Sequence, residues 1–274
     1  MLRGHQVLRP EFPESTYQNF RNPQPDDGRM RPPCGAAAMH LNPTYTFDRY
    51  LPSAPRAVAP TLCRALAARV SSRHRCLFLH GPPGSGKTHL LHAVGHATRQ
   101  DNASARVVIV SCADLVVDLI EDLRRGLVPE IRSTFARANV LLVDNLEVIV
   151  DRPATQTEIA RALVACLTNG GVVAGAATCR PRSLRELTAQ IPAALGPRNL
   201  VVKRASRAQA RRILLQEAES WGLNPPDRTV DRMARQSGGD ARTALGMFSR
   251  WHLEQKLSAG AIARPGGSAT TCTL

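Results

Sequence analysis

The feature that most constrains the fold of this chain is a phosphate-binding pattern at residues 80–88. The stretch reads HGPPGSGKT and matches G-x-x-x-x-G-K-[ST] from Gly81 to Thr88. It lies between an apolar run, 76–79, and a helix-forming segment, 90–97, as the motif requires. Glycines here let backbone N–H groups converge on phosphate oxygens at the positive end of the following helix. The pattern therefore predicts a nucleoside-triphosphate site, because a purely structural turn would leave the Lys87-Thr88 pair unexplained.

The residue types around this loop predict ATP or ADP and Mg²⁺ as cofactors. We expect Lys87 to neutralise the β- and γ-phosphates and the Thr88 hydroxyl to ligate Mg²⁺. Further along, the apolar run 140–143 ends in Asp144. In P-loop proteins an Asp at such a position, outside the carboxyl end of a parallel sheet, lies next to the Mg²⁺ ion (the Walker B Asp). The loop residues predicted to contact the nucleotide are Gly81, Pro82, Pro83, Gly84, Ser85, Gly86, Lys87, Thr88 and His89.

Strand-like and helix-like segments alternate before residue 206. The predicted strands are 75–80, 106–111, 140–144, 172–178 and 198–202, and the predicted helices are 57–70, 114–125, 130–138 and 155–167. Because this alternation gives parallel β-α units, we expect an α/β fold with a doubly wound parallel sheet. Beyond Ser206 the pattern is helical, with segments from 206, at 227–236 and at 240–257, which predicts a small helical lid.

These patterns predict four regions. Residues 1–40 are rich in proline and are expected to form a disordered arm, 41–205 the P-loop α/β subdomain, 206–257 the helical lid, and 258–274 a disordered tail.

His89, His92 and His96 share one face of the helix predicted after the phosphate loop. No carboxylate or cysteine pattern accompanies them, so we interpret them as ordinary helix-face residues and not as metal ligands.

Composition indicates the compartment and one class of partner. Seven cysteines without C-x-x-C spacing favour a reducing compartment, and no apolar run approaches the length of a membrane span, so we expect a cytoplasmic protein without a membrane partner. The net charge of +14 favours contact with nucleic acid. The alternative is genome base composition, because arginine and alanine are abundant throughout the chain.

Several motifs, in order, resemble the nucleotide-binding domain of the bacterial replication initiator DnaA, a member of the AAA+ class. They are LNPTYTFD at 41–48, GKTHLLHAVGH at 86–96, NVLLVDN at 139–145, TQTE at 155–158 and Arg180-Pro181, and the resemblance covers about 41–256. It implies that Asn42, Tyr45 and Phe47 help to form the adenine side of the site. It also implies that Arg242 is the sensor II arginine, which reaches from the lid to the γ-phosphate. The helix at 114–125 lies where the family contacts single-stranded DNA, and AAA+ packing implies a homo-oligomer.

The sequence departs from the family at the position that activates water. Asn145 follows Asp144 where the initiator usually has a second acid. An amide cannot accept a proton, so general-base assistance worth ~10²–10⁴-fold in rate is missing unless Glu147 or another group supplies it. We therefore expect at most a weak ATPase, with Asp144, the degenerate Asn145 and Arg242 at the reacting centre.

Three further departures concern other parts of the family pattern. Cys179 stands where the family has an Asp after a strand, and the arginine finger is missing from 187–195. A finger is worth on the order of 10³–10⁵-fold in rate, unless Arg198 replaces it. Few residues follow the lid, so the initiator's helix-turn-helix domain and its sequence-specific duplex binding are not expected.

The resemblance leads to one main hypothesis and two alternatives. The main hypothesis is a slow nucleotide switch in DNA replication initiation or its regulation, similar to Hda-type regulators. Its partners would be a DnaA-type initiator, the sliding clamp, the replicative helicase or single-stranded DNA. One alternative is a helicase-loader or transposition-accessory ATPase on single-stranded DNA. The other is a non-catalytic AAA+ interaction module.

Overall fold

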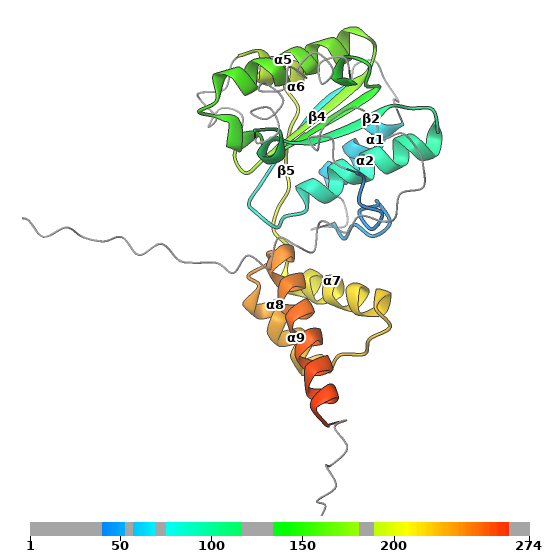
Figure 1. Cartoon of the computed structure of the whole chain (residues 1–274), viewed down its shortest axis with the longest axis vertical. Helices are drawn as coiled ribbons and strands as arrows, with labels where there is room; N and C mark the ends of the chain where they lie inside the picture. Colours follow the sequence, from blue (N-terminus) through cyan, green and yellow to red (C-terminus); the bar gives the residue numbers. More distant parts are fainter. Residues whose placement is uncertain (1–39, 53–56, 69–74, 117–133, 181–188, 263–274) are drawn as a thin grey trace, which may run out of the picture. The chain divides into compact units, whose positions relative to one another are not determined.

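The apolar runs of the sequence form a five-stranded parallel sheet in a computed structural model of the chain (Figure 1). The structure describes residues 40–52, 57–68, 75–116, 134–180 and 189–262. The strands are β1 (Cys76–His80), β2 (Val107–Ser111), β3 (Val140–Asp144), β4 (Val172–Ala177) and β5 (Asn199–Val201), and their order in the sheet is β2-β3-β4-β1-β5. All four pairs of neighbouring strands are parallel. The predicted α/β fold class is confirmed.

Helices cover both faces of this sheet (Figure 1). The α1 (Val58–Ala67) and α2 (Lys87–Asp101) helices pack on one face, where the core contains Leu77 and Leu79 of β1. The α5 (Pro153–Thr168) and α6 (Gln190–Leu195) helices pack on the other face, which contains Phe78. Successive strand residues point to opposite faces. A strand that is buried on both faces therefore has the continuous apolar sequence found here.

Three helices follow β5 and share a core of their own, and we refer to them as the lid. They are α7 (Arg207–Ser220), α8 (Asp227–Gln236) and α9 (Ala241–Ile262). Ser206 begins α7 with a capping box: its hydroxyl accepts a hydrogen bond from the Gln209 backbone N–H, and the Gln209 side chain accepts one from the Ser206 N–H. The lid core includes Leu214, Met233 and Phe248.

Some features differ from the prediction. The 3₁₀ helix η4 (Leu146–Ile149) and the short helix α6 were not predicted, and α9 continues to Ile262, past the predicted end at 257. Residues 112–116 and 134–136 are helical, while the rest of the predicted helices 114–125 and 130–138 lies outside the described residues. So do the arm up to residue 39 and the tail from 263. Within the described ranges, no helix is both long and apolar enough to cross a membrane.

Candidate nucleotide-binding site

The phosphate loop connects β1 to α2, and no side chain covers the N–H groups at the start of α2 with a capping hydrogen bond. Gly84 and Gly86 have φ angles of 69° and 95°, a left-handed conformation that glycine adopts without a steric penalty. Gly86 is also the N-cap of α2, and no side chain caps this helix end. Ser85 Oγ is the one buried side-chain polar atom without a hydrogen-bond partner that we find in the described part of the chain. Free donors at a helix N-terminus fit a phosphate group.

Lys87 folds back over the loop. Its Nζ donates hydrogen bonds to the carbonyl oxygens of Gly81, at 2.7 Å, and Pro82, at 3.0 Å. Burial lowers the pKa of Lys87, whereas the nearby carboxylates of Asp144 and Glu147 act in the opposite direction. A second cation, Arg242, contributes to lowering this pKa. The ammonium group thus lies among charges of both signs at the end of the loop.

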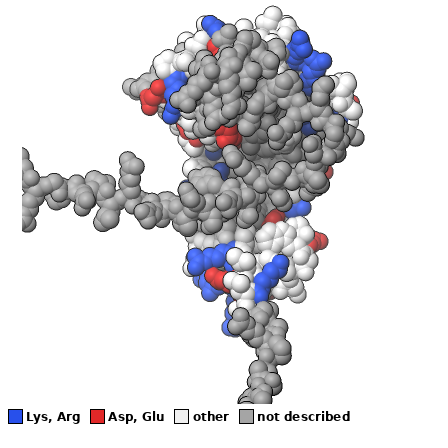
Figure 2. All heavy atoms as spheres, in the orientation of Figure 1, with Lys and Arg blue, Asp and Glu red and all other residues white. Residues whose placement is uncertain are grey.

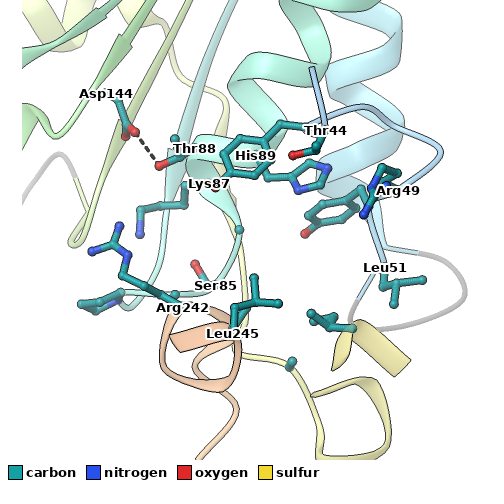
Figure 3. Close-up of a pocket in the computed structure, with 18 of the residues that line it drawn as sticks. Thr44, Arg49, Leu51, Ser85, Lys87, Thr88, His89, Asp144, Arg242 and Leu245 are labelled. Carbon is teal, nitrogen blue, oxygen red and sulfur yellow. Dashed lines mark hydrogen bonds between the residues drawn. The ribbon is translucent and has the colours of Figure 1, made fainter. Parts of the chain in front are cut away.

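Thr88 and Asp144 meet although they are far apart in the sequence. The Thr88 hydroxyl donates a 2.5 Å hydrogen bond to Asp144 Oδ2 (Figure 3), and Asp144 is buried at the carboxyl end of β3. Burial raises the pKa of Asp144, against the hydrogen bonds from Thr88 and the Asn145 N–H and the charge of Lys87. Two oxygens at one point fit a Mg²⁺ ion that takes its other ligands from phosphate and water. No group of three or more His, Cys, Asp or Glu residues in the described ranges could hold a metal without such help.

A cavity of about 470 Å³ extends from the loop to the lid. In Figure 3, Lys87 and Arg242 point into the same region from α2 and α9. The predicted site residues that line the cavity are Pro83, Gly84, Ser85, Gly86, Lys87, Thr88, His89, Tyr45, Asp144, Asn145 and Arg242. Gly81 and Pro82 belong to the loop but not to the cavity wall. The structure therefore brings most of the predicted residues together, from four separate segments of the chain.

Asn42 and Phe47 do not line the cavity, and their place on the adenine side of the site stays a prediction. Phe47 is buried against α1, where the Arg64 guanidinium carbon lies 4.5 Å from the ring centroid. The Asn42 backbone is held by α2: its N–H donates to His92 Nδ1 at 3.0 Å, and its carbonyl accepts from His96 Nε2 at 2.7 Å. Both residues thus fix the segment that carries Tyr45 and do not face the cavity.

The three histidines of α2, interpreted above as helix-face residues, make hydrogen bonds that hold the chain segment before α1. Besides the two bonds to Asn42, His89 Nε2 donates to the Thr46 carbonyl at 2.8 Å. Burial is the main cause that lowers the pKa of His89 and of His92, the latter to about 4. Tyr45 stacks on the His89 ring at a centroid distance of 4.9 Å, and Tyr50 meets the same ring edge-on at 5.3 Å. The histidines therefore attach 42–46 to the phosphate-loop helix, and His89 gives the cavity an aromatic wall together with Tyr45 and Tyr50.

Several lining residues were missed because they converge only in the folded chain. They include Arg49, Leu51, Thr178, Lys203, Ile213, Glu217 and Leu245. Arg49, in the segment 40–52, forms an ion pair at 3.4 Å with Glu217 of α7. Tyr50 adjoins the conspicuous aromatic segment 41–48, which could have indicated it. No sequence pattern marks Lys203 or Leu245.

The structure also places the other residues at which this sequence differs from the family pattern. Cys179 follows β4 as a partly buried thiol, whose pKa is raised first by burial and then by Glu147. The stretch 187–195, where the family has its finger arginine, forms α6 from Gln190 onward, with Ile191 and Leu195 buried. Residues 187–188 lie outside the described residues. Arg198 directly precedes β5, and its carbonyl accepts the N–H of Phe78 in the middle of β1. Arg198 does not line the cavity.

Comparison with known proteins gives consistent results. The family model for the bacterial DnaA ATPase domain matches residues 41–198. The chromosomal replication initiator protein DnaA of Acinetobacter baumannii (strain SDF) is 27% identical over 252 residues, 88% of this chain and 54% of that protein. DnaA of Chloroflexus aurantiacus is 27% identical over 211 residues, 77% of this chain and 44% of that protein. The chain thus spans about half the length of the curated relatives that it matches.

Solved structures show the same fold. Domain III of the Thermotoga maritima replication initiation protein DnaA superimposes with a TM-score of 0.70 at 20% identity, covering 81% of this chain and 92% of that one. DnaA from Aquifex aeolicus bound to AMPPCP gives 0.64 at 20% identity, covering 75% and 64%. A DnaA bound to AMPPCP and single-stranded DNA gives 0.64 at 19% identity, covering 80% and 70%.

Proposed function

Because this chain belongs to the bacterial DnaA ATPase domain family, we propose that it binds ATP or ADP with Mg²⁺ and acts as a slow nucleotide switch in DNA replication initiation or its control. The observation that carries the proposal is the meeting of Lys87, Thr88 and Asp144 at one cavity. These residues supply a cation, a hydroxyl and a carboxylate where a magnesium–nucleotide complex needs them.

Each group has a distinct proposed task in this switch. The loop N–H groups and Lys87 hold the phosphates, while Thr88 and Asp144 hold Mg²⁺. Bound Mg²⁺ would neutralise charge on the β- and γ-phosphates. Arg242 contacts the γ-phosphate from α9, so the lid binds ATP and ADP differently. Asn145 has no carboxylate to activate water at the position where the family usually has one, so hydrolysis is expected to be slower than in an initiator with that acid and the ATP state longer-lived.

The first test is a titration of a fluorescent ATP analogue in the presence of Mg²⁺. Lys87→Ala should weaken binding about 10–150-fold, because a hydrogen bond to a charged group contributes ~1.5–3 kcal/mol. Lys256→Ala, which removes an exposed lysine outside the cavity, should bind like the wild type. Equal and negligible affinity in wild type and Lys87→Ala would refute nucleotide binding.

The second test separates the switch from simple nucleotide storage. If Arg242 contacts the γ-phosphate, Arg242→Ala should lose the preference for ATP and keep its affinity for ADP. Arg250→Ala is a suitable control, because Arg250 is an exposed arginine of the same helix outside the cavity. An unchanged ratio of ATP to ADP affinity in Arg242→Ala would exclude this arginine as the sensor.

We propose single-stranded DNA as one partner. A similar DnaA has been solved with single-stranded DNA, and this chain carries a net charge of +14. Lys and Arg side chains (blue) are prominent over the lid in Figure 2. Arg228, Arg232 and Arg235 are exposed on one face of α8, where they suit phosphate contacts. Anisotropy of a labelled oligonucleotide should show binding that weakens steeply with salt.

Protein partners are the remaining part of the proposal. Pull-down experiments can test the initiator, the sliding clamp and the replicative helicase, each with ATP and with ADP. They would identify the protein whose binding depends on the bound nucleotide. Retention that depends on the nucleotide is the expected result for the true partner. Light scattering with ATP tests the homo-oligomer that AAA+ packing implies. Equal retention of all three proteins with ATP, ADP and no nucleotide would contradict a switch.

A further inference from the structure

Asn145 has a structural task that explains why an amide is tolerated at its position. Its φ and ψ angles are 58° and 41°, and it is the only non-glycine residue with a positive φ in the described part of the chain. Asparagine adopts this left-handed conformation more readily than most residues. The Asn145 N–H donates to Asp144 Oδ1 at 2.9 Å, and its carbonyl accepts the Val148 N–H at 3.0 Å. Asn145 therefore turns the chain from β3 into η4.

This turn brings a carboxylate to the cavity two residues later. Leu146 and Ile149 are fully buried and anchor η4 in the core. Residues three apart lie on one side of a 3₁₀ helix, so Glu147 lies on a different side from these anchors. Glu147 lines the same cavity as Lys87 and Asp144. Since Glu is one methylene longer than Asp, its carboxylate reaches further from the backbone.

The Glu147 carboxylate is held at the end of a neighbouring strand. Its Oε2 accepts the backbone N–H of Thr178, directly after β4, at 3.2 Å. Among the described residues, its other oxygen, Oε1, has no protein hydrogen-bond donor. Glu147 also opposes the lowering of the Lys87 pKa and raises the pKa of Asp144. The carboxylate therefore lies within electrostatic range of both groups assigned to phosphate and metal.

We propose that Glu147, in place of Asn145, accepts the proton of the water that attacks the γ-phosphate. The water oxygen forms a bond to the γ-phosphorus, and the bond from that phosphorus to the β,γ-bridging oxygen breaks. The products are ADP and inorganic phosphate, and the proton passes to Glu147 Oε1 and then to solvent. This inference rests on the proposed nucleotide-binding function.

Glutamine at position 147 separates the chemistry from the architecture. Gln keeps the size of the side chain and an oxygen that can accept the Thr178 N–H, but it cannot accept a proton. The matched control is Asp151→Asn, which neutralises an exposed carboxylate just after η4 that does not line the cavity. Both variants and the wild type are tested as the full chain, first for binding of the ATP analogue and then for single-turnover hydrolysis of ATP with Mg²⁺.

The expected result is a loss of turnover without a loss of binding. Glu147→Gln should hydrolyse ATP about 10²–10⁴-fold more slowly than the wild type, the range for general acid–base assistance. Its ATP affinity and melting temperature should stay close to those of the wild type, and Asp151→Asn should be unchanged. Hydrolysis by Glu147→Gln at the wild-type rate would overturn the inference. So would a wild type that binds ATP and never hydrolyses it, whereas absence of binding would refute the proposed function itself.

Discussion

Replacing Gly84 with alanine tests how tightly the lid is attached to the phosphate loop. The Ala241 N–H, in the first turn of α9, donates to the Gly84 carbonyl at 3.1 Å. A Cβ atom added at Gly84 would lie only 1.9 Å from Asp240 Oδ1 and 2.2 Å from Asp240 Cγ. Real atoms cannot approach so closely, so the carboxylate has to move. Asp240 Oδ1 would then give up its hydrogen bond to the Thr243 N–H, which is 3.1 Å long and caps α9.

The expected loss of stability has two parts. Gly84 has a φ of 69°, and an L-residue in the left-handed region costs ~1–2 kcal/mol. Loss of the Asp240 cap costs ~1 kcal/mol. Gly84→Ala should therefore lower the free energy of unfolding by ~2–3 kcal/mol. In an Asp240→Ala background the cap is already absent and the clashing atoms are gone, so the same change should cost only the backbone part, ~1–2 kcal/mol.

Urea unfolding followed by circular dichroism gives the four free energies of this double-mutant cycle. Gly222→Ala is a matched control, because Gly222 has a φ of 65° and a Cβ atom there would meet nothing within 4 Å. It should cost ~1–2 kcal/mol with or without Asp240. If Gly84→Ala costs no more than Gly222→Ala, or costs the same in both backgrounds, the close contact with the lid does not exist.

Three further predictions address pH, hydrolysis and the lid. Burial, followed by His96 and His89, lowers the pKa of His92 from 6.5 to about 4. The unfolded chain therefore binds a proton first, and stability present above pH 6.5 should be lost as the pH falls towards 4, by at most ~3 kcal/mol. His92→Asn, which keeps an acceptor for the Asn42 N–H, should show a smaller loss in urea unfolding at pH 7.5 and 4.5. Asn145→Asp should raise the ATP hydrolysis rate, with a larger relative gain when Glu147 is Gln; equal rates in turnover assays would contradict this. Phe248→Ala should destabilise the lid by ~3–5 kcal/mol, measured as faster hydrogen exchange of α7 to α9, and unchanged exchange would contradict the packing of this core.

The sheet could be predicted from sequence because each long strand is buried on both faces. The runs 107–111 and 140–144 show neither the helical period of polar residues nor the strict alternation of an exposed strand. They are therefore typical of strands with both faces buried. The small elements could not be predicted for a related reason. Four residues at 146–149 are too few to show a period, and α6 is only six residues long and contains Pro192, a residue unfavourable inside a helix. Only packing against the sheet gives these short segments their structure.

The site was predictable where one motif fixes both the backbone and the side-chain direction. Lys87, Thr88 and Asp144 are in this class, since the loop and the end of β3 determine where they point. Asn42 and Phe47 are not, because a match to a family segment gives the position of the chain and not which side chains face the cavity. Whether a lid residue reaches the loop depends on how two separate cores pack, and no local pattern records that.

The division of the cavity between two cores has a thermodynamic consequence. Ala241, Arg242 and Leu245 of α9 form part of the wall. Among the described residues, the lid core that holds α9 has far fewer buried residues than the cores on the sheet. Regions with few buried contacts open locally at lower free energy than the rest of a protein. A molecule with an open lid lacks this wall, so the apparent affinity of any ligand is reduced in proportion to the fraction of closed molecules. The stability of the lid core would therefore influence the apparent affinity for a ligand even when the phosphate loop is unchanged.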